Sequence, residues 1–369
     1  MADSPDIKYL IALGMIKGIG PRYANLILTE YETAEEVFKE SPAILSRIPY
    51  VGNALSAGVT SGAALKRAEK EIEYCKKHNI MVIGRDDYEY PAAMRECCDA
   101  PFVLYQKGNI NLNNIRALSI VGTRHSTSYG SEMIQSIVKQ LSESFPDLII
   151  VSGLAYGVDI CAHKNAIRNN LNTVAVLAHG LDRIYPGEHL NDAEKIVNKG
   201  ALLTEYPTGT EPEKGNFLAR NRIIAALSVG TLIVESDTKG GAMATARIAS
   251  SYNREVMALP GRVIDKYSRG CNYLINSGIA SLVTSPEDIA NVLNWEIKKD
   301  VQKSLNFELS QIEKTIIDLM KVNETPLHIN IIAEKSNLSV SETAGILIDL
   351  EMRNILKHMP GSMYRIRNI

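Results

Sequence analysis

The sequence lacks most of the features that mark specialised classes of protein. Its 369 residues include five cysteines and one tryptophan. The cysteines form neither a C-x-x-C pair nor the spacing of a zinc site, so we expect reduced, mostly buried thiols in a cytoplasmic protein. The first twenty residues lack a basic segment followed by an apolar one, and no apolar run reaches the length of a membrane span. We therefore predict no disulfide framework, no signal peptide and no contact with a membrane.

An excess of charge of either sign is also missing, because the formal net charge is −2. This balance excludes a surface covered uniformly with positive charge, so a nucleic-acid site would have to be a local patch. The hydrophobic fraction of 45% and the charged fraction of 22% are typical of a globular protein with a sizeable core. The length predicts two or three domains rather than one.

Established catalytic and nucleotide-binding fingerprints are absent. There is no G-x-G-x-x-G and no Walker A loop, and Ser152 lacks the G-x-S-x-G elbow of serine hydrolases. Asp159 and His163 are spaced as two ligands on one helix face, but no third ligand accompanies them. Glu205 and Glu235 could act as an acid and a base, although we expect them to orient a backbone amide or an arginine. The sequence thus predicts no metal, no cofactor and no covalent catalysis.

What is present divides into three parts. Residues 1–75 contain two glycine-bearing turns, at 16–21 and 48–52, and each turn precedes a helical segment. Such turns aim backbone N–H groups at a phosphate in helix-hairpin-helix motifs, which predicts a helical domain of the helix-hairpin-helix or SAM-like kind. The alternative is a packing module whose glycines only form corners.

Residues 76–296 alternate between apolar runs and segments of helical periodicity. Continuous apolar strands separated by helices predict an α/β fold with a doubly wound, mostly parallel sheet that is covered on both faces. Two further apolar segments at 80–84 and 101–105 precede this series as extra strands or an extended lead-in. The six predicted central strands are 117–121, 148–151, 173–177, 201–203, 231–234 and 256–259.

Residues 305–369 follow a charged connector at 296–303 and predict three helices and a hairpin, the order of a winged helix. The third helix, at 339–354, carries Glu342, Asp349 and Glu351 and a single Arg353. A helix with this charge is poorly suited to reading a major groove. We therefore predict that the C-terminal domain binds protein or regulates, and this argues against a transcription factor.

In open α/β sheets the ligand lies at the carboxyl ends of the strands, so the turns there are the places to search. The turn at 121–130 offers Gly122 for close approach, Arg124 for charge, and Ser126 or Ser128 as a helix cap, which predicts an anion site. The turn at 151–159 contains Gly153 and predicts a second close approach of backbone to a phosphate or sugar.

The segment 214–223 is the most informative one. It carries Lys214, Arg220 and Arg222 without an acid, and a helix would place Phe217, Arg220 and Asn221 on one face. Cations for phosphates and a ring for a base are what single-stranded nucleic acid requires. The alternative is an amphipathic helix with a buried Phe217 and solvated arginines.

Taken in order, the strand-end motifs resemble those of the DNA processing protein A (DprA, or Smf) family. The resemblance covers the whole central domain, and the flanking domains suit the longer members of the family. The matching segments are VGTRHSTSYG at 121–130, SGLAYGVDICAH at 152–163, HGLDRIYP at 179–186, TEYPTGTEP at 204–212, FLARNRIIAAL at 217–227, VESDTKGGAMATA at 234–246, NREVMALPG at 253–261 and GCNYLI at 270–275.

The resemblance implies an extended Rossmann-like domain that binds single-stranded DNA in a basic pocket. It also implies a homodimer through that domain, protection of incoming DNA, and delivery of the RecA recombinase during natural transformation. The chain departs from the family where an acidic residue and a glycine are replaced by Ser236-Asp237 and the next loop contains an extra lysine. The implied DNA-binding positions are Arg124, Lys214, Phe217, Arg220 and Asn221, with Arg222 as a neighbour, and Gly122, Gly153 and Gly240 would shape the pocket. The strand-end residues themselves add two DNA-binding candidates, Ser126 and the extra lysine, Lys239.

One enzymatic alternative stays open. Sugar-phosphate hydrolases use related sheets with glycine-rich loops, so a phosphoribohydrolase-like nucleotide hydrolase is the competing hypothesis. The P-G-G-x-G-T-x-x-E signature of one such family is absent from this sequence.

Overall fold

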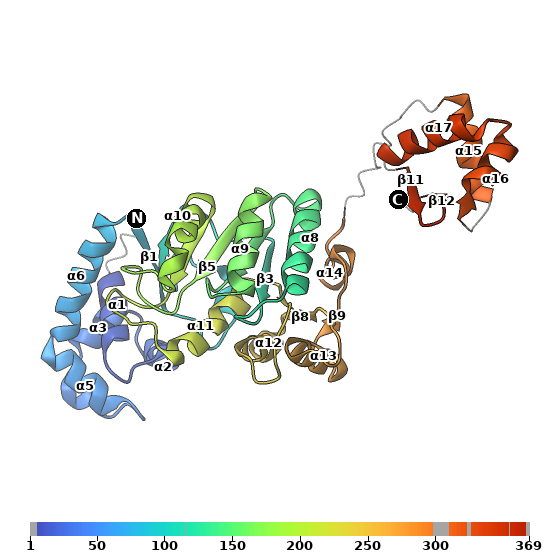
Figure 1. Cartoon of the computed structure of the whole chain (residues 1–369). Coiled ribbons are helices and arrows are strands. Elements are labelled where there is room, and N and C mark those ends of the chain that lie inside the picture. Colours follow the sequence, from blue (N-terminus) through green and yellow to red (C-terminus); the bar gives the residue numbers. More distant parts are fainter. Residues whose placement is uncertain (1–5, 114, 298–309, 323–325, 354, 367–369) are drawn as a thin grey trace. The chain divides into compact units, whose positions relative to one another are not determined.

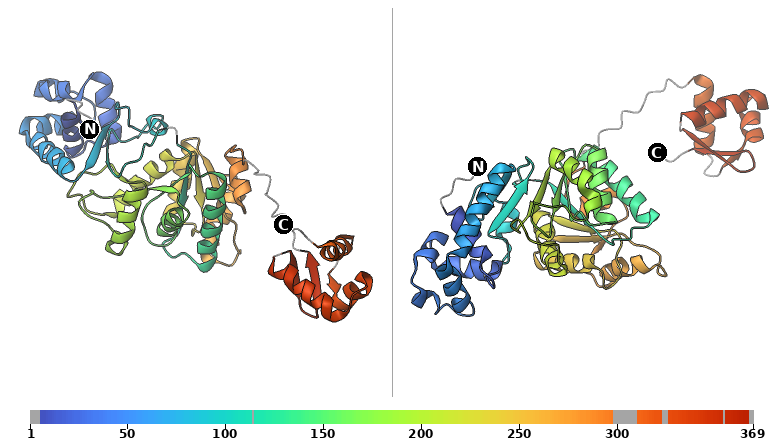
Figure 2. Two further views of the ribbon diagram at one scale, coloured as in Figure 1. Left: turned by 90° about the horizontal axis from the view of Figure 1, so that it is seen from above. Right: turned by 60° about the vertical axis from the view of Figure 1, so that its left-hand side comes forward.

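The computed structural model describes residues 6–113, 115–297, 310–322, 326–353 and 355–366. The chain forms two compact units, Met1–Lys298 and Lys299–Ile369, and each is described here by itself (Figures 1 and 2). Of the predicted connector, residues 298–303 lie outside the described residues, as do the first five residues of the predicted domain at 305–369. No helix among the described residues is long and apolar enough to cross a bilayer.

The N-terminal part of the first unit is a module of short helices. The chain turns between α1 and α2 at Gly18, which has a φ of +92° that favours glycine. The module packs against the sheet, since a Cβ on Gly14 would lie 2.7 Å from the Phe102 ring. Its helices are α1 (Ile7–Met15), α2 (Pro21–Glu30), α3 (Ala34–Lys39), α4 (Pro42–Leu45), α5 (Gly52–Ser61) and α6 (Ala63–Lys77).

A nine-stranded sheet forms the centre of this unit, in the order β1-β2-β6-β5-β4-β3-β7-β8-β9. The β1–β2 and β2–β6 pairs are antiparallel and the others are parallel. The predicted α/β class with a mostly parallel, doubly wound sheet is therefore confirmed. The strands are β1 (Ile80–Gly84), β2 (Val103–Lys107), β3 (Ala117–Val121), β4 (Ile149–Ser152), β5 (Asn172–Val176), β6 (Ala201–Thr204), β7 (Gly230–Ile233), β8 (Glu255–Ala258) and β9 (Ser281–Leu282).

Helices cover both faces of the sheet because the central strands are apolar on both sides. One face carries α8 (Ser128–Ser144), α9 (Val158–Arg168) and α10 (Leu190–Lys199), and the other carries α11 (Lys214–Leu227), α12 (Gly241–Ser251) and α13 (Arg269–Asn276) (Figure 1). The remaining elements are α7 (Ala92–Arg95), α14 (Pro286–Val292) and the 3-10 turns η1 (Gly187–His189) and η2 (Lys266–Ser268).

The order of the strands reverses beside β3. From β3 the chain runs through β4, β5 and β6 to one side, whereas β7 and β8 lie on the other side. In doubly wound sheets this switch point opens a crevice at the carboxyl ends of the strands, where ligands bind. The loops after β3, β4 and β7 meet there.

The second unit is a winged helix, as predicted. A core of Ile316, Leu347, Leu350 and Leu356 joins three helices to a three-stranded sheet of order β10-β12-β11. Arg353 forms ion pairs with Glu313 and Asp349. The elements are α15 (Gln311–Val322), β10 (Leu327–His328), α16 (Ile329–Ser336), α17 (Val340–Met352), β11 (Leu356–Met359) and β12 (Met363–Ile366).

Candidate nucleic-acid interface

An open pocket of about 860 Å³ lies at the switch point. Its walls come from the loop after β3, the loop after β7, the first turns of α12 and one face of α11. Eight of the predicted contact residues line it, and the other three, Ser126, Gly153 and Arg222, do not. The eight are Gly122, Arg124, Lys214, Phe217, Arg220, Asn221, Lys239 and Gly240.

Four exposed cations stand around the pocket: Arg124, Lys214, Lys239 and Arg247. None of the four forms an ion pair within the part of the chain that the structure describes. Their charge is consequently available to an anionic ligand.

Phe217 provides the aromatic surface of the pocket. The ring is half-buried, so the alternative of a fully buried core phenylalanine is wrong. The Arg124 guanidinium lies 5.2 Å and that of Arg220 5.9 Å from the ring centroid, within the range of cation–π contact. Tyr185, which is 43% exposed, has its ring centroid 5.8 Å from that of Phe217.

Arg220 serves the architecture of the pocket as well as lining it. Only 4% of the residue is exposed, and its guanidinium donates to the carbonyls of Gly153, at 2.7 Å, and of Val176. These carbonyls belong to the carboxyl ends of β4 and β5, so Arg220 ties the two ends together. Burial lowers the pKa of Arg220 to about 10, and the nearby Asp159 opposes that shift.

Arg222 is not brought to the pocket. Two positions beyond Arg220, it lies on the other side of α11, is 8% exposed and donates to Glu205 at 2.5 Å. A step of two residues turns a helix by roughly 200°, which explains the opposite orientation. Glu205 therefore orients an arginine, as expected from the sequence. Burial raises the pKa of Glu205, and Arg222 opposes that shift.

The N-terminus of α8 differs from the prediction. The cap is Thr127 rather than Ser126 or Ser128, since the Thr127 side chain accepts from the Gly130 N–H. The predicted anion is supplied by the protein, because the Glu235 carboxylate accepts from the N–H of Thr127 at 2.9 Å and from its hydroxyl at 2.6 Å. Ser126 donates to the same carboxylate at 3.3 Å. Ser126 is thus part of this internal cap.

The N-terminus of α12 faces the pocket instead. The residues from Gly240 to Ala244 line the pocket, and the helix has neither a side-chain cap nor an acid in its first turn. Backbone N–H groups and the helix dipole favour an anion at such a position. The start of α12 is therefore suited to an anion from outside the protein.

The three predicted glycines are places where backbone and side chains approach closely. A Cβ on Gly153 would lie 2.5 Å from the Arg220 guanidinium, and one on Gly122 would lie 2.8 Å from the Glu235 carbonyl oxygen. A Cβ on Gly240 would meet the Ser236 hydroxyl at 2.4 Å. Gly153 therefore makes room for Arg220 and shapes the pocket without lining it.

Two pocket residues escaped the sequence analysis: Arg247, on α12, and Tyr267, in the turn before α13. Arg247 lies seven positions after Gly240, so extending α12 by two turns from the glycine loop could have located it. Tyr267 comes from a segment with no strand-end motif of its own, and no local signal could have located it.

The described residues contain no group of three or more His, Cys, Asp and Glu side chains that could hold a metal ion. His163 is fully buried, its Nδ1 lies 2.7 Å from the Thr173 hydroxyl, and burial lowers its pKa to about 3. Asp159 lines the pocket, and burial raises its pKa while Arg220 lowers it.

These features define a class: a Rossmann-like protein with an open cationic pocket at its switch point, in a chain that also contains a helix-hairpin-helix module and a winged helix. Three family models match the chain in the same order. They describe a SAM-like helix-hairpin-helix tandem at 10–57, DNA recombination-mediator protein A at 81–294 and a DprA winged helix domain at 302–362. The chain belongs to the DNA recombination-mediator protein A (DprA/Smf) family.

Individual relatives agree with this assignment. Protein Smf of Synechocystis is 30% identical to this chain, and the match covers 97% of this chain and 98% of the relative. The DNA processing protein DprA of Streptococcus pneumoniae is 38% identical, and the match covers 54% of this chain and 70% of the relative. The X-ray structure of the latter protein superposes with a TM-score of 0.66 at 32% identity, covering 77% of this chain and 97% of that one. A structure of DprA from Helicobacter pylori, described for its single-stranded DNA binding mode, superposes with a TM-score of 0.53 at 32% identity. It covers 58% of this chain and 95% of that one.

Proposed function

We propose that this protein binds single-stranded DNA in the switch-point pocket. The observation that carries the proposal is the combination of four unpaired cations, the open start of α12 and the half-buried Phe217 ring around one cavity. Cations and backbone amides suit the phosphates, and a ring suits a base that is not paired. The single-stranded DNA binding mode of the Helicobacter pylori relative supports the proposal.

Fluorescence anisotropy with labelled oligo-dT and with a duplex of equal length tests this function. We expect the protein to prefer the single strand and to lose affinity as salt is raised. Phe217→Ala should weaken binding by about 1–3 kcal/mol, with little change in the salt dependence, because it removes a stacking surface and no charge. Equal affinity for both DNAs, or none for oligo-dT at low salt, contradicts the proposal.

We further propose that the bound strand is handed to the RecA recombinase and is protected meanwhile, as a mediator acting in natural transformation would do. Membership of the recombination-mediator family supports this role. The protein would act in the cytoplasm as a homodimer through the sheet domain. The handover is tested by measuring RecA ATPase activity on single-stranded DNA to which this protein is already bound. The dimer is tested by sedimentation at several protein concentrations.

Covalent catalysis is not part of this proposal. Glu205 and Glu235, which the sequence offered as an acid and a base, are engaged with Arg222 and with the cap of α8. Release of free base from nucleoside monophosphates measures the competing hydrolase activity directly. Efficient turnover would replace the mediator hypothesis.

For the organisation of the chain we propose the boundaries 1–75, 76–296 and 305–369. Limited proteolysis followed by mass spectrometry tests them, and stable fragments should end close to these positions.

A further inference from the structure

The loop that leads into α11 is held from outside the sheet domain. It runs from the end of β6 at Thr204 to Glu213, immediately before Lys214 and Phe217. Because the loop sets where α11 begins, whatever holds the loop also sets where these two pocket residues stand. We call residues 205–213 the β6–α11 loop.

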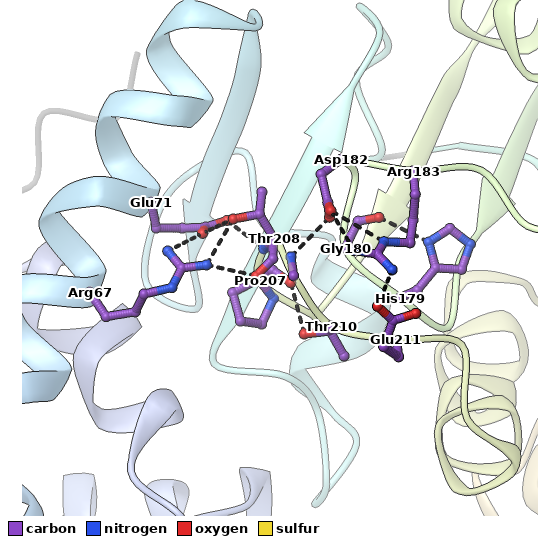
Figure 3. A network of polar contacts seen from close by, with 11 residues as sticks. Arg67, Glu71, His179, Gly180, Asp182, Arg183, Pro207, Thr208, Thr210 and Glu211 are labelled. Atoms are coloured by element: carbon purple, nitrogen blue, oxygen red, sulfur yellow. Dashed lines mark hydrogen bonds and ion pairs between the residues drawn. The ribbon is translucent and has the colours of Figure 1, made fainter.

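One side of this loop is bound by helix α6 of the N-terminal module. The Glu71 carboxylate accepts from the Thr208 N–H at 2.8 Å and from its hydroxyl at 2.5 Å, while Arg67 donates to the Thr208 carbonyl at 2.6 Å (Figure 3). Arg67 also pairs with Glu71 at 2.8 Å. Two side chains of α6 therefore bind the carbonyl, the N–H and the hydroxyl of a single loop residue.

Glu71 is an unusual residue at this place. Only 1% of it is exposed, although glutamate is seldom buried without partners. A buried carboxylate carries a large desolvation cost that charged and polar partners must offset. Thr208 and Arg67 are those partners, so the buried charge of Glu71 is stabilised by its contacts with the loop and with Arg67.

The other side of the loop is bound by the segment after β5. The Gly209 N–H donates to Asp182 at 3.0 Å, and Arg183 pairs with both Asp182 and Glu211 (Figure 3). Gly209 has a φ of +80°, a backbone conformation that favours glycine. Burial opposes the shift, but the Gly209 N–H and Arg183 outweigh it and lower the pKa of Asp182. The loop is thus fastened at neighbouring residues from two directions.

We propose that Glu71 is a positioning residue through which the N-terminal module holds the β6–α11 loop and, with it, the DNA-binding face of α11. This inference rests on the proposed function for its effect on DNA. Glu71 itself does not line the switch-point pocket. The module would thereby contribute to single-strand affinity without contacting the strand in that pocket.

Removing the charge of Glu71 distinguishes a positioning role from a general electrostatic effect, because the two predict opposite changes in DNA affinity. Glu71→Gln removes a negative charge, and electrostatics alone predicts stronger binding to a polyanion. Loss of positioning predicts the opposite, a Kd for oligo-dT that is higher by about five-fold or more. Glu73→Gln, at an exposed position of the same helix, is the matched control and should leave the Kd unchanged or slightly lower.

The salt dependence adds a second criterion. Since Glu71 acts through the loop that positions Lys214, Glu71→Gln should weaken binding and lower the slope of log affinity against log salt by at most about 0.7, the value for one phosphate contact on a single strand. Thr208→Val removes the loop's hydroxyl and should weaken binding less. The double variant should be no weaker than Glu71→Gln alone, because both changes break one network.

Hydrogen exchange without DNA decides the structural part. In Glu71→Gln we expect faster exchange in peptides covering 205–216 and no change in β3 and β4, which separates release of the loop from general unfolding. Unchanged exchange in 205–216 overturns the proposal, and so does an oligo-dT affinity equal to that of Glu73→Gln. If the wild-type protein ignores oligo-dT, the proposed function fails, while the exchange result still decides whether Glu71 holds the loop.

Discussion

Helices α8 and α12 begin at the same group of strand ends, and each follows a strand, a glycine and a polar loop. They differ in what their N-termini meet. The first turn of α8 is closed by the Glu235 carboxylate, which Thr127 binds through its N–H and hydroxyl. The first turn of α12 has no acid and no side-chain cap, and it lines the pocket.

The difference shows how one local pattern can serve structure at one site and binding at another. A helix N-terminus attracts an anion in either case. At α8 the protein supplies that anion from Glu235, in the loop after β7, whereas at α12 an external phosphate would have to supply it. The cations Lys239 and Arg247 stand on the α12 side, which fits this division. The comparison predicts which changes affect DNA and which affect stability.

The largest effect should come from giving α12 an anion of its own. A Cβ on Gly241 would meet nothing within 4 Å, so Gly241→Asp is accommodated and places a carboxylate in the first turn. We expect oligo-dT affinity to fall more than about ten-fold, because the carboxylate both occupies the helix dipole and repels phosphate. Anisotropy measures the loss. Gly241→Asn is the neutral control of equal size, and equal losses in both variants would show that bulk rather than charge is responsible.

A smaller effect is expected from removing one cation of the pocket. Lys214→Ala should weaken oligo-dT binding several-fold and reduce the salt slope by about 0.7, the value for one phosphate contact on a single strand. Titrations at four salt concentrations give the slope. Lys139→Ala, at an exposed position of α8, should change neither quantity. A slope that stays the same in Lys214→Ala would mean that this lysine contacts no phosphate.

Much of the fold follows from the sequence because its signals are local. The six central strands are continuous apolar runs, and all six are present in the sheet.

The site is less predictable, because burial and long-range partners decide it. The sequence identifies α11 as cationic, yet only packing shows that Arg220 faces the switch point while Arg222 turns away to Glu205. Glu235 reaches the start of α8 from 108 residues along the chain, and no local motif could assign that contact. Similarly, no sequence motif around Thr208 predicts its hydrogen bonds to Glu71.

Glu235→Gln sharpens the comparison from the α8 side. The change removes the charge that closes α8 and should lower the free energy of unfolding by about 1–2 kcal/mol, with almost no effect on oligo-dT affinity. Urea unfolding can be followed by the fluorescence of Trp295, the one tryptophan, whose ring packs 5.3 Å from that of Phe145 in the same unit. Glu255→Gln, at the exposed first residue of the adjacent strand β8, serves as control. A large loss of DNA binding in Glu235→Gln would erase the distinction between the two helices.

The smallest effect should follow removal of the winged helix. Its third helix, α17, presents acids, and its following Arg353 is already paired with Glu313 and Asp349, so it offers little charge to a phosphate. Deleting residues 305–369 should change oligo-dT affinity by less than about two-fold, because the cations that we propose to bind the strand belong to the other unit. Anisotropy on the shortened and full-length chains measures this directly. A marked loss of affinity would mean that the single strand also binds the winged helix, and that the acidic helix does not determine what this unit binds.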